Sequence, residues 1–155
     1  MARVIVLDAG PLGLASKQRG RPDGDRCREW LRALDRAGVR VVTPEIADYE
    51  VRRELLRLGA TAALLRLDQL ESLLDYDPLS TPAVRRAAEF WAYVRRSGKA
   101  QPTADPHALD GDCLLAAQAS LLGDPGDVVT IATTNARHLV RFPGTDAQQW
   151  DAIVP

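Results

Sequence analysis

The chain has few of the features that mark secreted, zinc-bound or membrane-spanning proteins. Cys27 and Cys113 are its only cysteines, so neither a disulfide framework nor a cysteine-rich zinc site is expected. Asp8 breaks the first apolar run before it can serve as the core of a signal peptide. The longest later run, Leu114 to Leu122, is interrupted by polar residues and is too short to cross a bilayer. We therefore expect a cytoplasmic protein with both thiols reduced.

Lysine and net charge are also scarce. Lysine occurs only at Lys17 and Lys99, and the net charge is −1. The chain as a whole therefore lacks the basic field that indicates nucleic-acid binding. Arginine supplies nearly all the positive charge, and its bidentate contacts with phosphate are compatible with RNA binding. The same bias is typical of a GC-rich genome, so composition leaves the two explanations open.

Length and periodicity predict one α/β domain over residues 1–155. The chain is long enough for a hydrophobic core, and 46% of its residues are hydrophobic. Short apolar runs alternate with segments of helical spacing, which favours a central parallel sheet flanked by helices in three layers. The predicted strands are Val4–Leu7, Val39–Val42 and Val128–Ala132, with a last extended piece near Trp150–Val154. The predicted helices are Asp25–Ala37, Pro44–Leu58, Thr61–Leu74, Thr81 to Gly98, Leu109 or Asp112 to Leu122, and Asn135–Leu139.

Two helix starts carry the same signal, a threonine followed by proline. Thr43 is predicted to cap a helix with Pro44 in its first position, and Gly59 is predicted to end that helix. Thr81 and Pro82 open the later helix, whose spacing predicts a buried face. The residues expected on that face are Val84, Ala87, Ala88, Trp91 and Val94. The segments Ser16–Gly24 and Lys99–His107 are predicted loops, and Asp75–Leu79 is predicted to be an extended connector.

Four polar residues spread along the chain each lie at or near the boundary of an apolar segment. Asp8 closes the first strand, Glu50 lies within the predicted helix after the second, Asp112 opens a helix, and Asn135 follows the strand Val128–Ala132. Ligands of open α/β sheets bind beyond the carboxyl ends of the strands, where Asp8 and Asn135 are predicted to lie. Gathered there, these side chains would form an oxygen-lined site suited to Mg²⁺ or Mn²⁺.

Each of these positions also has an ordinary structural explanation. Asp8 is suited to a turn after a strand, and Asp112 to a helix N-cap, although Asp110 can fill that role instead. Glu50 can form an exposed pair with Arg53, one helical turn later. Taken one at a time, the positions favour these explanations. Taken as a set at these places in the topology, they favour a metal site.

Four stretches of the sequence resemble the PIN-domain family, and within it the VapC-type toxin ribonucleases. They occur in the family's order and with similar spacing over almost the whole chain, and each is short. The stretches are Val6–Leu12, Thr43–Ile46 leading to Tyr49–Val51, Asp112–Ala119, and Thr133–Leu139.

The resemblance implies a central parallel sheet and metal-dependent hydrolysis of RNA. It also implies a homodimer and inhibition by a cognate antitoxin protein. Asp8, Glu50 and Asp112 would be the metal-binding acids, and Asn135 stands where the family often has a fourth acid. Asparagine offers a carbonyl oxygen and no charge, which leaves the number of metal ions open. The implied reaction is attack of a metal-activated water on a phosphodiester, leaving 5′-phosphate and 3′-hydroxyl ends.

Several other residues are candidates for supporting roles. Asp105 and Asp110 are candidate auxiliary ligands, and Thr133 or Thr134 would form a hydrogen bond near the site. Four arginines are candidate phosphate contacts, although arginines on helix faces usually contact only water: Arg52, Arg53, Arg137 and Arg141. The many leucines from Leu55 to Leu74 would form core for the most part, and some would line a groove for an antitoxin helix or a dimer contact.

Three other functions are weaker interpretations of the sequence. A thiol enzyme would use Cys113 with His107 or His138 as base, but Cys113 is flanked by apolar residues. An aspartyl-phosphate phosphatase would need a second aspartate where Gly10 stands, and a receiver domain would need a lysine near Thr133. The non-enzymatic alternative is a PIN-like module that binds RNA or protein and has lost catalysis through Asn135.

Overall fold

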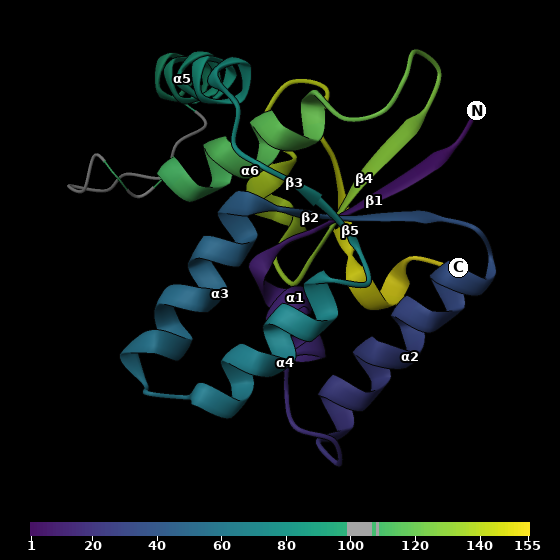
Figure 1. The fold of residues 1–155 in the computed structure, drawn as a ribbon. Helices are drawn as coiled ribbons and strands as arrows, with labels where there is room; N and C mark the ends of the chain where they lie inside the picture. Colours follow the sequence, from purple (N-terminus) through teal and green to yellow (C-terminus); the bar gives the residue numbers. More distant parts are fainter. Residues whose placement is uncertain (99–106, 108) are drawn as a thin grey trace.

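The computed structural model describes residues 1–98, 107 and 109–155, and these residues form a five-stranded parallel sheet between two layers of helices (Figure 1). The strand order is β3-β2-β1-β4-β5. The strands are β1 Arg3–Leu7, β2 Arg40–Pro44, β3 Asp75–Asp77, β4 Val128–Thr133 and β5 Asp146–Gln149. The predicted parallel sheet covered on both faces is confirmed.

The helices divide between the two faces of the sheet. Their bounds are α1 Ala9–Ala15, α2 Pro22–Arg36, α3 Glu45–Arg57, α4 Thr61–Glu71, α5 Thr81–Arg96, α6 Asp110–Ser120 and α7 Ala136–Leu139, with a short 3-10 turn at Trp150–Ala152. In Figure 1, α5 and α6 lie on one side of the sheet and α1, α2 and α4 on the other. Within the described residues, no helix has both the length and the apolar character that crossing a membrane requires.

The alternation of side chains along β1 builds one core on each face. Val4 and Val6 pack into the core shared with α5 and α6, whereas Ile5 and Leu7 pack into the core shared with α1 and α2. A strand buried on both faces reads as a continuous apolar run, as β1 does. Because β1 lies at the centre of the sheet, the residue that follows it, Asp8, is held firmly in place.

The order of the strands reverses between β1 and β4. From β1 the chain crosses to β2 and β3 on one side, and later to β4 and β5 on the other. In open α/β sheets, ligands bind in the crevice beyond the carboxyl ends of the strands at which the order reverses, which here are β1 and β4. Asp8 follows β1, and Asn135 comes shortly after β4.

The prediction that Thr43 caps the helix now labelled α3 is wrong by one residue. Thr43 and Pro44 pair with Tyr76 and Asp77 of β3, so β2 continues through Pro44 and α3 begins at Glu45. Pro44 is the N-cap instead of the first helical residue. The Thr43 hydroxyl is buried and has no hydrogen-bond partner among the described residues.

Edge strands and one short helix were also predicted wrongly. The expected connector Asp75–Leu79 contains β3, and the last strand is Asp146–Gln149 instead of Trp150–Val154. Both edge strands are polar, so they lack an apolar signal. The helix α1 was not predicted because Gly10 and Pro11 normally end regular structure, yet proline is tolerated in a first helical turn. The helix α2 begins at Pro22, inside the predicted loop Ser16–Gly24. Nearly all of the other predicted loop, Lys99–His107, lies outside the described residues.

The observed burial of side chains corrects two predictions about which apolar residues form the core. On α5, Val84 and Ala88 are exposed, and the core face consists of Ala83, Ala87, Phe90 and Val94. The leucines from Leu55 to Leu74 are predicted to be mostly core, and this is only partly confirmed: Leu67 is buried, Leu55, Leu70 and Leu74 pack half-buried against the same core, and the others do not. The helix α4 is also shorter than predicted, and Leu73 beyond its end is 82% exposed.

A network of charged side chains fastens α3 to α4. The Arg52 guanidinium on α3 lies 3.0 Å from Asp48, 2.7 Å from Asp68 and 3.2 Å from Glu71, and the Tyr76 hydroxyl donates to Asp48 at 3.3 Å. Burial, followed by hydrogen bonding with Asp48, raises the pKa of Glu71 to about 8. One positive charge thus faces three carboxyl groups, and a proton on Glu71 reduces their repulsion.

This network predicts a pH dependence of stability. Since the pKa of Glu71 is higher in the folded protein than its ordinary value of 4.5, the folded state binds more protons between about pH 4.5 and about pH 8. The contribution of this group to the free energy of unfolding is therefore complete below that window and is lost as the pH rises through it. Glu71→Gln, which cannot ionise, is expected to flatten this decline in urea unfolding curves measured from pH 5 to 9. An unchanged slope in the variant would contradict the assignment.

Candidate active site

Asp8 is the best-anchored acidic residue at the crevice between β1 and β4. Its backbone N–H donates to the Ala132 carbonyl at 2.9 Å. Its carboxylate accepts a hydrogen bond from the Ala9 N–H at 2.7 Å and another from the Thr133 hydroxyl at 2.6 Å. The Thr133 hydroxyl in turn accepts from the backbone N–H of Asn135 at 2.9 Å. The ends of β1 and β4 are thus joined through the carboxylate of Asp8.

Glycine at position 10 allows the two loops to meet. A Cβ at Gly10 would lie 2.6 Å from the Thr134 hydroxyl oxygen, which is closer than real Cβ atoms come. The first turn of α1 therefore approaches the loop after β4 only because this residue has no side chain. This contact is a second tie between the segments that follow β1 and β4.

Glu50 and Asp112 bring two more carboxylates to Asp8 from separate helices. Burial raises the pKa of Glu50, and the charges of Asp8 and Asp112 raise it further, whereas Arg53 opposes the shift. Burial likewise raises the pKa of Asp112, and the charge of Asp8 adds to this rise. The fold thus brings the three predicted acids of α3, α6 and the end of β1 within electrostatic reach of one another.

A second glycine that the sequence analysis missed lies where α3 meets α6. A Cβ at Gly111 would lie 3.0 Å from Oε1 of Glu50, and the next closest atom would be the carboxyl carbon of Glu50 at 3.5 Å. The Glu50 carboxylate therefore lies against the backbone of the residue before Asp112. The signal in the sequence was a glycine in the first turn of a helix, where alanine is more stable.

Positive charge at the site comes from the C-terminal segment. Arg141 lies 3.4 Å from Oδ2 of Asp112 and donates to the His138 carbonyl at 2.6 Å. The charges of Arg141 and then His138 lower the pKa of Asp112, against the larger effect of burial. Arg141 was predicted as a phosphate contact, and here it partly neutralises an acid. No local pattern indicates this pairing, because Asp112 lies in the first turn of α6 and Arg141 lies in the turn after α7.

The other predicted site residues have different surroundings. Asn135 is exposed at the start of α7, and its backbone, instead of its side chain, contacts Thr133. Asp110 is exposed and lies 3.1 Å from Nδ1 of His107. Asp105 lies outside the described residues. The fold therefore gathers the three carboxylates and links Asn135 to them only through Thr133.

The remaining candidate arginines differ in whether their guanidinium groups are available to bind phosphate. Arg52 is held by the three carboxyl groups that fasten α3 to α4 and is not available to phosphate in this arrangement. The Arg53 guanidinium lies over the Tyr49 ring, 5.0 Å from the centroid; its charge acts on Glu50, but the two form no ion pair within the described residues. Arg137 is exposed on α7.

The thiol alternative fails on burial. Cys113 is 2% exposed, and burial followed by the charges of Asp112 and Asp110 raises its pKa to about 12. A cysteine nucleophile needs a thiolate at neutral pH, which this environment disfavours. Cys27 is also free and buried.

The donor chemistry of the three acids fits a hard divalent cation. Carboxylate oxygens are the ligands that Mg²⁺ and Mn²⁺ prefer, and a cation would relieve the repulsion that raises the pKa of Glu50 and Asp112. In the part of the chain that the structure describes, no three histidine, cysteine or acidic side chains are already arranged around one point as metal ligands. Binding would therefore require side-chain adjustment, such as release of Asp112 from Arg141.

Comparison with known proteins agrees with this architecture. Residues 5–142 match the PIN domain family. No curated protein sequence matches the chain. Among solved structures, VapBC2 from Rickettsia felis, bound to a DNA fragment from its promoter, is similar with a TM-score of 0.72 and 17% identity over 96% of this chain and 99% of that chain.

Two further structures have the same fold. DNA-bound VapBC from Salmonella typhimurium has a TM-score of 0.66 and 21% identity over 97% of this chain and 99% of that chain. FitAcB from Neisseria gonorrhoeae has a TM-score of 0.64 and 21% identity over 96% of this chain and 99% of that chain.

Gly111→Ala tests whether the contact between α3 and α6 sets the position of Glu50. The added methyl should displace the Glu50 carboxylate and weaken Mn²⁺ binding on the order of tenfold, a typical effect of altering the supports of a metal site. Calorimetric titration of the purified protein measures this affinity. Gly13→Ala is the matched control, because a Cβ there meets only Val51, at 3.9 Å. Equal affinities for Mn²⁺ in both variants would refute the proposed contact.

Proposed function

Because the chain belongs to the PIN-domain family, we propose that it is a Mg²⁺- or Mn²⁺-dependent endoribonuclease of the VapC toxin type. The observation that supports this proposal is that Asp8, Glu50 and Asp112, which come from the end of β1, from α3 and from α6, act on one another electrostatically. Holding like charges together at a partly buried site costs stability, and such arrangements cluster at functional sites. A reaction that requires a bound cation accounts for this cost, because the cation offsets the repulsion among the three acids.

The residues of the site have distinct roles in the proposed reaction. Asp8, Glu50 and Asp112 would hold the cation, which when bound polarises water and offsets the charge of the phosphodiester. Thr133 fixes the orientation of Asp8 through its hydroxyl. Arg141, half-buried beside Asp112, is placed to exchange that partner for a phosphate of the RNA once a cation neutralises the acid. The products would carry 5′-phosphate and 3′-hydroxyl ends.

Cleavage of a mixed RNA pool by the purified protein tests this proposal. We expect cutting with Mg²⁺ or Mn²⁺ and none with EDTA. Asp8→Ala and Asp112→Ala should each lower the rate roughly 100-fold or more, comparable to the loss of one strong electrostatic contact in a transition state. Both variants should stay folded, because each removes a charge that repels its neighbours.

Asp8→Asn and Arg26→Ala complete the design. The asparagine variant preserves the shape of Asp8 and removes its charge, so it should be as inactive as the alanine variant. Arg26 lies over Trp150, away from the three acids, and its loss should leave the rate unchanged. Full activity of Asp8→Ala would refute the site. RNA binding without cleavage under any metal would favour the alternative, a PIN-like binding module without catalysis.

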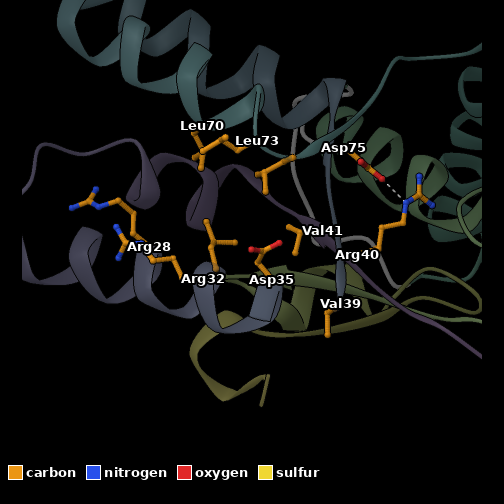
Figure 2. A pocket seen from close by; sticks show the side chains of 11 residues that line it. Arg28, Arg32, Asp35, Val39, Arg40, Val41, Leu70, Leu73 and Asp75 are labelled. Atoms are coloured by element: carbon orange, nitrogen blue, oxygen red, sulfur yellow. Dashed lines mark hydrogen bonds and ion pairs between the residues drawn. The ribbon is translucent and has the colours of Figure 1, made fainter. Parts of the chain in front are cut away.

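We further propose that an antitoxin protein covers the hollow between α2 and the segment after α4. Figure 2 shows Leu70 and Leu73 facing the side chains of α2 across this hollow, whose volume is about 580 Å³. Arg28, Arg32 and Arg40 also line it; each is paired with a carboxylate, but the side chains of Arg32 and Arg40 remain 56% and 47% exposed and can still meet acidic groups of a partner. The occupant we infer is an apolar segment that bears acidic side chains. The similarity to VapBC structures supports a protein partner of this kind.

Leu73→Asp tests this surface. The substitution should weaken binding of the cognate antitoxin protein by about tenfold or more, because Leu73 would be buried in the complex. RNA cleavage by the free variant should be unchanged. Leu121→Asp, another exposed leucine outside the hollow, is the control, and affinity is measured by surface plasmon resonance. Equal binding by both variants would remove this surface as the docking site.

A second copy of the chain is the partner we propose for the apolar face of α3. Tyr49, Leu56, Leu79 and Leu114 line a hollow of about 490 Å³ there, and Leu56 is 61% exposed. This exposed apolar hollow is the observation that supports the proposed homodimer. Leu56→Glu should convert the dimer to a monomer in light scattering, since it places a charge in an apolar contact. A monomeric unmodified protein would contradict the proposal.

A further inference from the structure

Gln118 is a buried polar side chain that the proposed reaction does not use. It lies on α6 and is 1% exposed, among apolar residues of the same helix. A buried amide without partners destabilises a fold by leaving unsatisfied donors and acceptors. Its contacts therefore explain why glutamine is tolerated here.

The Gln118 amide joins three elements of the fold. Its Oε1 accepts a hydrogen bond from the backbone N–H of Ile46 at 3.1 Å, in the first turn of α3. Its Nε2 donates to the Asp77 carbonyl at 2.7 Å and to the Asp77 carboxylate at 3.0 Å. One side chain thus connects α6 with the start of α3 and with the edge strand β3.

Two of the connected helices carry acids of the proposed site. Ile46 lies one helical turn before Glu50 on α3, and Gln118 lies less than two turns after Asp112 on α6. Both helices are rigid over such short distances. A change at the Gln118 contacts is therefore transmitted to the separation of Glu50 and Asp112.

We propose that Gln118 is a positioning residue that sets the separation between Glu50 and Asp112. This inference rests on the proposed function, because it assigns Gln118 the task of keeping two cation-binding helices in register. Gln118 touches none of the three acids in this role. It acts through Ile46 on one side and through its own helix on the other.

Gln118→Met tests the proposal, since it preserves volume and removes every hydrogen bond of the amide. We expect Mn²⁺ affinity, measured by calorimetry without RNA, to fall on the order of tenfold. We also expect faster amide hydrogen exchange at the start of α3, centred on Ile46. Trp30→Phe is the matched control, because it removes a buried hydrogen bond of 2.9 Å to the Ile153 carbonyl, at the α2 side of the sheet.

A merely structural role predicts a different outcome. In that case both variants lose similar stability in urea and both keep the Mn²⁺ affinity of the unmodified protein, which would overturn the proposal. Unchanged exchange at Ile46 in Gln118→Met would overturn it as well. If the unmodified protein binds no Mn²⁺ and cuts no RNA, the proposed function fails, and hydrogen exchange alone then decides whether Gln118 holds α3.

Exchanging the donor and acceptor roles of the side chains at positions 118 and 77 gives a rescue experiment for Mn²⁺ affinity. Gln118→Glu retains the acceptor for Ile46 but places a carboxylate against that of Asp77, so it should weaken Mn²⁺ binding. Adding Asp77→Asn supplies an amide donor to the new carboxylate, while the backbone carbonyl of residue 77 remains without its donor, so the double variant should restore part of the affinity. Failure of the double variant to recover beyond Gln118→Glu alone would contradict the geometry.

Discussion

The carboxylates of Asp8, Glu50 and Asp112 repel one another, so the fold around them has to hold them together. The three carboxylates come from the end of β1, from α3 and from α6, and burial makes their charges harder to sustain. Arg141 provides partial compensation on one side. An arrangement of this kind persists only if the surrounding fold holds the contributing elements more strongly than the acids repel one another.

Separate contacts hold each element in place. The Thr133 hydroxyl and the Ala9 N–H fix Asp8, while Arg52 fastens α3 to α4 through three carboxyl groups. Gln118 connects α6 with the start of α3. The contacts of Arg52 and Gln118 involve none of the three acids, so these supports are independent of the proposed chemistry, whereas Thr133 and Ala9 contact the Asp8 carboxylate itself. This independence is why substitutions of the supports are informative.

The sequence predicted the central features of the fold because they have local signals. The apolar runs of β1 and β4 are visible in the sequence, and so are Asp8 and Asn135 after them. The polar edge strands β3 and β5 have no such signal, since only pairing with a neighbour makes them strands. The extension of β2 through Pro44 has the same cause and moved the start of α3 by one residue.

The candidate site was predictable in its acids but not in its supports. Asp8, Glu50 and Asp112 could be singled out by residue type and position. Gly111, Arg141 and Gln118 act through contacts between elements far apart in the sequence, which no local pattern reveals. Burial likewise decided that Leu73 is surface instead of core, because the end of α4 could be located only in three dimensions.

Anomalous diffraction at the manganese edge, recorded from a crystal of the protein soaked in Mn²⁺, would locate the cation. We expect an anomalous peak bounded by the carboxylates of Asp8, Glu50 and Asp112, with Arg141 moved away from Asp112. No peak at this crevice, or a peak elsewhere while the three acids keep their present contacts, would contradict this expectation.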